Sequence, residues 1–323
     1  MKKLLLGIAA VCLAGFTFAQ DAPLWMRHSV ISPDGTTIAF TYKGDIYTVP
    51  VAGGRAMQIT TNPAYDTAPV WSPDSKRIAF ASDRMGSLDV YIVAKDGGEP
   101  RRLTTHSGSE TPLAFTDAGH VLFSAGIMPS AEAVVFPSNG QFNQVYRVSV
   151  EGGRPTMISS MPMECISINK EGAMLYQDKK GYEDYWRKHH VSPIARDIWM
   201  YTPGKEPQYR QLTTFGGEDR EPVWAPDGKT FYYLSEENGS FNIYRRTPGD
   251  AKAVQLTHYT KNPVRYLSAA TDGRLCYGFD GEIYTLLPGG EAQKVNISIV
   301  SDRNDKDIIR QIKSPGAPQM AWS

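Results

Sequence analysis

The chain repeats one pattern of four short apolar segments six times, and this repetition limits its fold more than any other feature. The first segment of each repeat ends in a turn rich in Pro, Asp and Gly, at positions 32–35, 72–75, 116–119, 169–172, 225–228 and 271–273. Proline presets the backbone angle φ, aspartate bonds to its own backbone, and glycine accepts a positive φ. The turns therefore predict antiparallel hairpins.

The segments after each turn read as strands. A short apolar strand comes first, and the next carries a polar, a β-branched and an aromatic residue in succession, as in Asp45, Ile46 and Tyr47. Such alternation indicates a strand with two unlike faces. Gly-Gly pairs at 53–54, 97–98, 152–153 and 289–290 turn the third strand into the fourth. Four strands in repeats of this length are typical of propeller blades.

We therefore expect an all-β fold, a six-bladed β-propeller with four antiparallel strands per blade. Packing six sheets around an axis buries faces that one sheet would expose, with the third-strand aromatic filling the gap between neighbours. A β-solenoid would need shorter repeats, and a sandwich would not repeat so regularly. The propeller should span 20–300, with blades at about 24–61, 62–105, 106–160, 161–214, 215–258 and 259–300. Each blade is complete in chain order, so no strand latch is evident, and we expect side-chain packing to close a seam between the first and sixth blades.

The N-terminus reads as a secretory signal peptide over residues 1–19. Lys2 and Lys3 precede a short apolar run, and the small residues Thr17 and Ala19 favour cleavage after Ala19. Lipidation would use Cys12, but Val11 before it is bulkier than the usual small residue. The sequence thus predicts a secreted or periplasmic protein with no membrane span after cleavage.

Composition and motifs point away from several functions. Basic and acidic residues balance at 34 each, which argues against a nucleic-acid partner. The sequence has no nucleophile elbow, zinc-protease motif, phosphate loop or Cys-x-x-Cys pair, so we predict no catalytic residue, cofactor or metal site. After cleavage only Cys165 and Cys276 remain, and we expect both to be free and buried.

The repeats resemble those of TolB-type propellers and, more specifically, the N-terminal six-bladed propeller of secreted bacterial tricorn-like proteases. The specific resemblance lies in residues 180–190, 196–199, 215–222 and 280–284. In that family a seven-bladed propeller, a PDZ domain and a serine-peptidase core follow, and oligopeptides are cut in an enclosed chamber. Residues 301–323 then read as a linker and the truncated start of a following repeat, so no catalytic residue can be carried over.

The resemblance implies a non-catalytic, substrate-gating or filtering propeller of a peptidase. Its partners would be oligopeptide substrates and the downstream peptidase domains, and a homo-oligomer stays open. The alternatives are a stand-alone TolB-like interaction module of the periplasm and the propeller of a prolyl-oligopeptidase-type enzyme.

Candidate binding residues emerge when the first strands are aligned on Trp71. The residue five before it is an acid in three blades, and the residue four before it is an arginine in three and an acid in one. The long insertions at about 126–143 and 179–196 fall on the same propeller face. We therefore predict peptide binding by Arg27, Asp66, Glu110, Glu164, Asp219, Arg220 and Arg265, with carboxylates meeting a peptide's amino terminus and arginines its carboxylate. Solvated rim residues or internal salt bridges are the alternative.

The second insertion has a composition of its own. It combines aromatic and basic residues, which are enriched at contact hot spots, and neighbouring histidines on a strand point apart and seldom share a metal. We predict an interface formed by Tyr182, Tyr185, Trp186, Arg187, His189 and His190.

Overall fold

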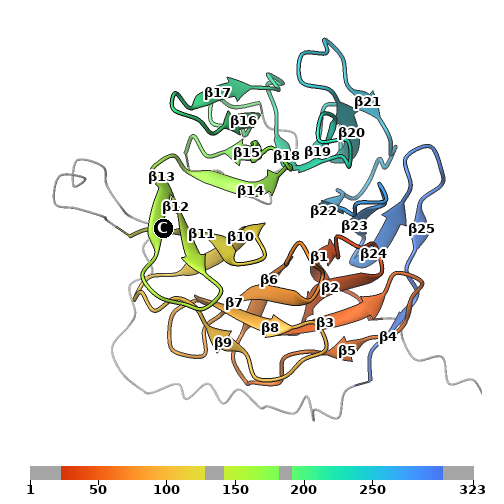
Figure 1. Ribbon diagram of the computed structural model, residues 1–323. Coiled ribbons are helices and arrows are strands. Elements are labelled where there is room, and N and C mark those ends of the chain that lie inside the picture. Colours follow the sequence, from red (N-terminus) through yellow and green to blue (C-terminus); the bar gives the residue numbers. More distant parts are fainter. Residues whose placement is uncertain (1–22, 128–141, 182–190, 301–323) are drawn as a thin grey trace, which may run out of the picture.

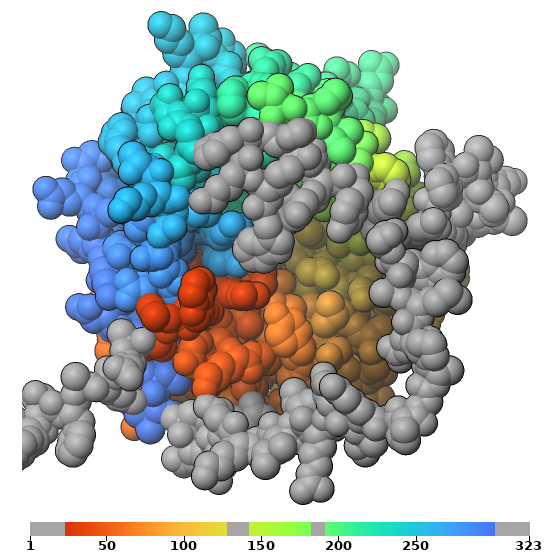
Figure 2. Space-filling view, turned by 180° about the vertical axis from the view of Figure 1, so that it is seen from behind, coloured from red at the N-terminus to blue at the C-terminus, as the bar shows by residue number. Residues whose placement is uncertain are grey.

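The computed structural model describes residues 23–127, 142–181 and 191–300, which form six four-stranded antiparallel sheets arranged as a propeller (Figure 1). The predicted all-β, six-bladed fold is confirmed, and the described residues contain no helix. Face on, the sectors follow one another around the ring, and the first (red) adjoins the last (blue) (Figure 2).

Each blade takes its four strands from one continuous stretch of chain. Blade 1 consists of β1 (Arg27–Ile31), β2 (Thr37–Tyr42), β3 (Asp45–Pro50) and β5 (Met57–Gln58), and blade 2 of β6 (Asp66–Trp71), β7 (Arg77–Ser82), β8 (Asp89–Ala94) and β9 (Arg101–Arg102). Blade 3 consists of β10 (Glu110–Asp117), β11 (His120–Ala125), β12 (Gln144–Ser149) and β13 (Thr156–Ser159), and blade 4 of β14 (Met163–Ile168), β15 (Met174–Asp178), β16 (Ile198–Thr202) and β17 (Gln208–Gln211). Blade 5 consists of β18 (Asp219–Trp224), β19 (Phe231–Ser235), β20 (Asn242–Arg246) and β21 (Val254–Gln255), and blade 6 of β22 (Arg265–Ala269), β23 (Leu275–Phe279), β24 (Glu282–Leu286) and β25 (Gln293–Lys294).

The turns between the first and second strands use the chemistry that their residues predict. In blade 1, Asp34 Oδ1 accepts hydrogen bonds from the Thr36 amide (3.0 Å) and the Ser32 hydroxyl (2.6 Å). Gly35 has a φ of 72°, a left-handed conformation that costs glycine little. The bonds of this turn are therefore made between residues close together in the chain.

The hydrophobic core is divided among the six blade boundaries. Each of six clusters of buried side chains draws its members from two neighbouring blades. At the boundary of blades 1 and 2, for example, Ile46 of β3 packs with Phe80 and Tyr91 of blade 2. The third-strand aromatics contribute to these clusters, as expected from the sequence. A blade is therefore stabilised chiefly by its neighbours.

The boundary between blades 6 and 1 has its own apolar cluster, which includes Phe40, Cys276 and Val295. The backbone adds a connection that the sequence did not predict. The short strand β26 (Ile297–Ser298) pairs in parallel with β4 (Gly54–Arg55), and the Gly54 amide donates to the Asn296 carbonyl at 2.8 Å. We call this β4–β26 pairing the strap, and it supplements the side-chain packing expected at the seam.

The connections between second and third strands change in length around the ring. They comprise residues 43–44, 83–88, 126–143, 179–197, 236–241 and 280–281 in blades 1 to 6. The shortest therefore lie in blades 1 and 6, and the longest in blades 3 and 4. The two shortest connections therefore flank the boundary between blades 6 and 1.

Candidate functional site

One face of the propeller, which we call the loop face, carries both the connections from second to third strands and the links between blades. Backbone hydrogen bonds hold the two sets together: the Asp66 amide donates to the Gly44 carbonyl (2.7 Å), and the Glu110 amide to the Leu88 carbonyl (2.7 Å). In five of the six blades the start of the first strand is thus bonded to the preceding blade's loop within the described residues. This places the candidate binding residues and the bases of both long insertions on one face.

Four of the seven predicted binding residues are buried, and three of these four are the acids at the position five before Trp71. The exposed fractions of Asp66, Glu110 and Asp219 are 0%, 1% and 1%. Asp66 accepts a forked pair of hydrogen bonds from Arg84 Nη2, both at 3.0 Å. These three carboxylates therefore do not form an exposed ring at this position. In this conformation these three residues cannot touch a peptide.

Burial also changes the acidity of two of these carboxyl groups. It raises the pKa of Glu110 to about 7, and the nearby charge of Asp89 adds to the effect. It likewise raises the pKa of Asp219 to about 7, opposed by hydrogen bonds from Ser235 and Thr213. A buried carboxylate is costly when another acid lies close. These groups are therefore partly protonated near neutral pH.

The other four predicted residues differ in their exposure to solvent and in their ion pairs. Arg27 is exposed and has no ion pair within the described ranges, whereas Arg265 is half-buried. Arg220 is buried, and its Nε donates to Glu218 Oε2 at 2.9 Å. Glu164 is half-buried and pairs with Arg196 at 3.2 Å. Of the three predicted arginines, Arg27 is the one most available to a ligand.

A network of charges lies where the 179–197 connection rejoins blade 4. Arg196 bridges Glu164 of blade 4 and Glu218 of the link to blade 5, at 3.2 and 3.4 Å. Lys179 adds a second cation 3.4 Å from Glu164. Arg196 and Glu218 are buried, and buried charges persist only when they are well paired. The network therefore fixes the base of this connection.

Sequence reasoning did not identify Arg196 or Glu218 as site residues. Both lie within the family-like motifs, but neither falls at the two aligned ring positions. The predicted interface residues Tyr182, Tyr185, Trp186, Arg187, His189 and His190 lie outside the described residues, as does most of the first insertion.

The position three before Trp71 was also overlooked. In five blades this residue has a positive φ between 49° and 58°, and the innermost strand shifts register there. None of the five is buried. The five residues, which we call the bend ring, are His28, Ala68, Cys165, Glu221 and Tyr266.

Members of the bend ring contact neighbouring inner strands. Glu221 Oε2 accepts a hydrogen bond from the Leu267 amide at 2.8 Å, and the His28 ring lies 4.9 Å from that of Tyr266. Cys165 is exposed, so the expectation that it is buried was wrong, because the bend turns its side chain out of the blade boundary. Cys276 is buried, as expected.

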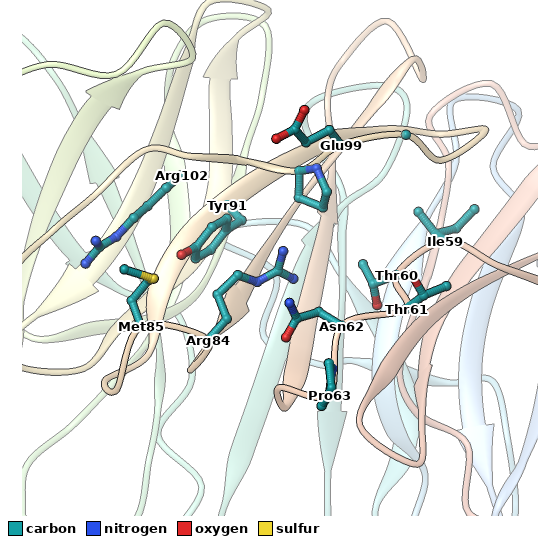
Figure 3. Close-up of a pocket in the computed structure, with 12 residues that line it drawn as sticks. Ile59, Thr60, Thr61, Asn62, Pro63, Arg84, Met85, Tyr91, Glu99 and Arg102 are labelled. Atoms are coloured by element: carbon teal, nitrogen blue, oxygen red, sulfur yellow. The ribbon is translucent and has the colours of Figure 1, made fainter. Parts of the chain in front are cut away.

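A cleft of about 660 Å³ opens between blades 1 and 2 (Figure 3). Arg84 and Arg102 lie on either side of Tyr91 in this view, and the Arg84 guanidinium carbon is 4.5 Å from the Tyr91 ring centroid. Both arginines already have buried counter-ions, Asp66 at 3.0 Å and Asp89 at 2.8 Å. The cleft therefore offers no uncompensated positive charge to a peptide terminus.

Two other kinds of site were sought among the described residues. Histidine, cysteine and acidic side chains nowhere gather in threes that could hold a metal ion within those ranges. The same part of the chain contains no helix long and apolar enough to span a bilayer.

Comparison with known proteins gives a consistent result. Residues 23–292 match the family described as the tricorn protease N-terminal β-propeller domain. Tricorn protease homolog 1 of Streptomyces coelicolor is 26% identical over 289 residues, which cover 88% of this chain and 26% of that protein. The tricorn protease homolog of Saccharolobus solfataricus is 23% identical over 297 residues, covering 87% of this chain and 26% of that protein. The chain thus spans about a quarter of the length of these relatives.

Solved structures show the same fold. The crystal structure of the tricorn protease superimposes with a TM-score of 0.72 at 19% identity, covering 88% of this chain and 27% of that one. TolB from Acinetobacter baumannii gives 0.59 at 14% identity, with coverages of 84% and 62%. Because the family match spans most of the sequence, this chain belongs to the tricorn protease N-terminal β-propeller family.

Proposed function

We propose that this propeller gates or filters oligopeptides for a tricorn-like serine peptidase without supplying catalytic residues. The observation that carries the proposal is the family match over residues 23–292. The named relatives are proteases in which a chain of this kind accounts for about a quarter of the length. Catalysis would belong to other parts of such a protein.

The geometry of the loop face supports a selective role. A buried ion network anchors the 179–197 connection on the side of the longest loops, and exposed Arg27 lies on the side of the shortest. Loops held by a rigid scaffold commonly carry binding sites. We further propose that the protein works outside the cytoplasm, since residues 1–19 have the composition of a secretory signal.

Peptide retention by the chain itself tests the proposal. Equilibrium dialysis against a tryptic oligopeptide mixture should enrich short peptides over an intact folded protein. The double variant Arg27→Ala/Arg265→Ala should lower this enrichment, whereas Arg154→Ala, an exposed residue outside the loop face, should not. No enrichment with the wild-type chain would contradict the proposal.

A second candidate is a stand-alone interaction module, which the structural likeness to TolB favours. The two differ in what the gene encodes. A reading frame that continues past Ser323 into a second propeller and a peptidase core supports the first function, and a stop codon nearby supports the second.

A further inference from the structure

An exposed aromatic pocket lies on the loop face of blade 1. It has a volume of about 740 Å³, within the range of pockets that hold small ligands or peptide side chains. We call it the blade 1 pocket, and its lining includes Leu24, Trp25, Arg27, Tyr42, Lys43 and Tyr65. Trp25 is 70% exposed, and Leu24 and Tyr65 are each nearly half exposed. So much exposed apolar surface in one place is typical of a contact site.

The backbone fixes the two exposed aromatics at equivalent places in the repeat. Trp25 and Tyr65 both stand six residues before the Trp71 position, and each lies against the glycine of a two-residue turn in the preceding blade. A Cβ atom on Gly281 would be 3.0 Å from the Trp25 amide nitrogen, and one on Gly44 would be 3.3 Å from the Tyr65 ring. Both glycines have a φ of 80° or more.

Trp25 itself has a φ of 69°, which is rare for a bulky residue and requires support from its surroundings. The next residue supplies such support, because the Met26 amide donates to the Gly281 carbonyl at 3.2 Å. Rigid aromatic anchors bind with little loss of conformational entropy. The structure therefore holds a large apolar side chain at the surface in a backbone conformation that carries an energetic cost.

The charge of the pocket defines what can enter it. Its described lining contains two cations, Arg27 and Lys43, and no acidic residue. Arg27 is exposed, and the Lys43 ammonium lies 5.8 Å from the Tyr42 ring centroid. Arginine binds a carboxylate through two parallel hydrogen bonds. An apolar cavity beside an available guanidinium is complementary to a large apolar side chain next to a carboxylate.

We propose that the blade 1 pocket binds peptide segments in which a large apolar side chain adjoins a carboxylate. The inference rests on the proposed function and specifies its substrate class. The carboxylate can come from an acidic side chain or from the peptide's C-terminus, since both present the same two oxygens. Because the loops of blades 1 and 6 are the shortest on this face, the described surroundings leave the pocket accessible to an extended chain.

Calorimetric titration of the 323-residue chain with four synthetic peptides tests the inference. Acetyl-Gly-Gly-Phe-Asp-amide offers a side-chain carboxylate, and acetyl-Gly-Gly-Gly-Phe offers a terminal one. Acetyl-Gly-Gly-Phe-Asn-amide lacks the charge, and acetyl-Gly-Gly-Ala-Asp-amide lacks the large apolar group. At least one of the first two should bind about tenfold more tightly than both controls, and the tighter one identifies the source of the carboxylate.

Variants connect this preference to the pocket. Arg27→Gln should remove the preference for the carboxylate, and Trp25→Ala the preference for phenylalanine. Their matched controls are Arg154→Gln and Tyr209→Ala, which change exposed residues away from the pocket and should leave all four affinities unchanged. Thermal melting checks that each variant is folded.

The outcomes separate this inference from the proposed function. If tryptic oligopeptides bind but Arg27→Gln and Trp25→Ala change no affinity, the pocket inference is overturned and the proposed function stands. If no peptide of any kind binds, both fail. Self-association that Trp25→Ala abolishes, seen by sedimentation without peptide binding, would instead assign the pocket to a second copy and overturn the inference.

Discussion

Asp66, Glu110 and Asp219 occupy equivalent positions in three blades, yet their surroundings differ. Asp66 is paired with Arg84, whereas burial and the charge of Asp89 raise the pKa of Glu110, opposed by hydrogen bonds with Thr104 and His106. Burial also raises the pKa of Asp219, opposed by hydrogen bonds with Ser235 and Thr213. Position in the repeat therefore does not decide the charge state of a residue; the side chains that surround it do.

Removing the Asp66 carboxylate should destabilise the protein strongly. Asp66→Ala leaves the Arg84 guanidinium without its buried counter-ion, which typically costs about 3–5 kcal/mol of unfolding free energy. Urea denaturation measures the change. Asp96→Ala, at an exposed turn, is the control and should stay within about 0.5 kcal/mol of the wild type. The double variant Asp66→Ala/Arg84→Met should recover part of the loss, and a double variant as unstable as Asp66→Ala would contradict the explanation.

Glu110 should make stability depend on pH in a definite direction. Its pKa is about 7 in the folded protein and about 4.3 in an unfolded chain, so the folded state holds the proton more tightly between these values. This contribution to stability is therefore full below about pH 4 and is lost as the pH rises to about 7. Glu110→Gln, which cannot ionise, should gain about 3 kcal/mol relative to the wild type between pH 4.5 and pH 8.

Urea midpoints of both proteins at these two pH values measure the gain. Comparing variant with wild type removes the opposite effect of His28, whose pKa burial lowers to about 4. A difference that does not change with pH would show that Glu110 does not titrate in this range.

The sequence predicted where these residues stand along each blade but not how deep they lie. Aligning the first strands on Trp71 placed Asp66 and Arg27 at adjacent ring positions. Depth depends on contacts with other strands and loops that lie farther along the chain. Arg84, for example, reaches Asp66 from the second-to-third-strand loop, and no local pattern around residue 66 reveals that contact.

The outermost strands are short, so strand pairings of only two residues help to close the ring. β4 and β26 contribute only Gly54–Arg55 and Ile297–Ser298. A connection this small would escape any search for hydrophobic alternation, which needs four or more residues to be recognised. The Gly-Gly pair at 53–54 was correctly interpreted as a turn, but its close approach to Asn296 could not be inferred from sequence.

Gly53→Ala should break the strap. A Cβ atom at this position would stand 2.5 Å from the Asn296 carbonyl oxygen, and the backbone φ is 85°. The matched control is Gly152→Ala in blade 3, where φ is 81° and nothing lies within 4 Å. Both variants place an alanine at a positive φ, which costs about 1–2 kcal/mol of stability, but only Gly53→Ala should lose more than this.

Amide hydrogen exchange measures the backbone hydrogen bonds of the strap directly. The Gly54 and Ala56 amides donate to Asn296 and Ser298, so their protection should fall in Gly53→Ala and persist in Gly152→Ala. Equal exchange in the two variants would mean that the strap does not form in solution.

For the whole molecule, the division of the core into six boundary clusters has a thermodynamic consequence. In open repeat arrays each unit contacts only its neighbours, so the end units can open separately. Here the seam has a cluster of its own, and every blade has two packed neighbours. The repeated sequence pattern predicted the number and order of the blades, because each blade's strands are local in the chain.

Phe80→Ala should therefore weaken the entire ring. Phe80 is fully buried and stacks 6.0 Å from Tyr91, so the truncation should cost about 3–5 kcal/mol. Amide exchange should accelerate in blades 4 and 5 as well as in blades 1 and 2. Met85→Ala, at a side chain that is 64% exposed, is the control. Acceleration confined to blades 1 and 2 would indicate that the blades open independently.

The five residues of the bend ring have the same backbone conformation but chemically different side chains. A left-handed bend sets the backbone of His28, Ala68, Cys165, Glu221 and Tyr266 alike, although these side chains have almost nothing else in common. A histidine, an alanine, a cysteine, a glutamate and a tyrosine therefore occupy equivalent positions with the same backbone conformation. The backbone at this position therefore tolerates side chains of very different size and charge without a change in the course of the inner strand.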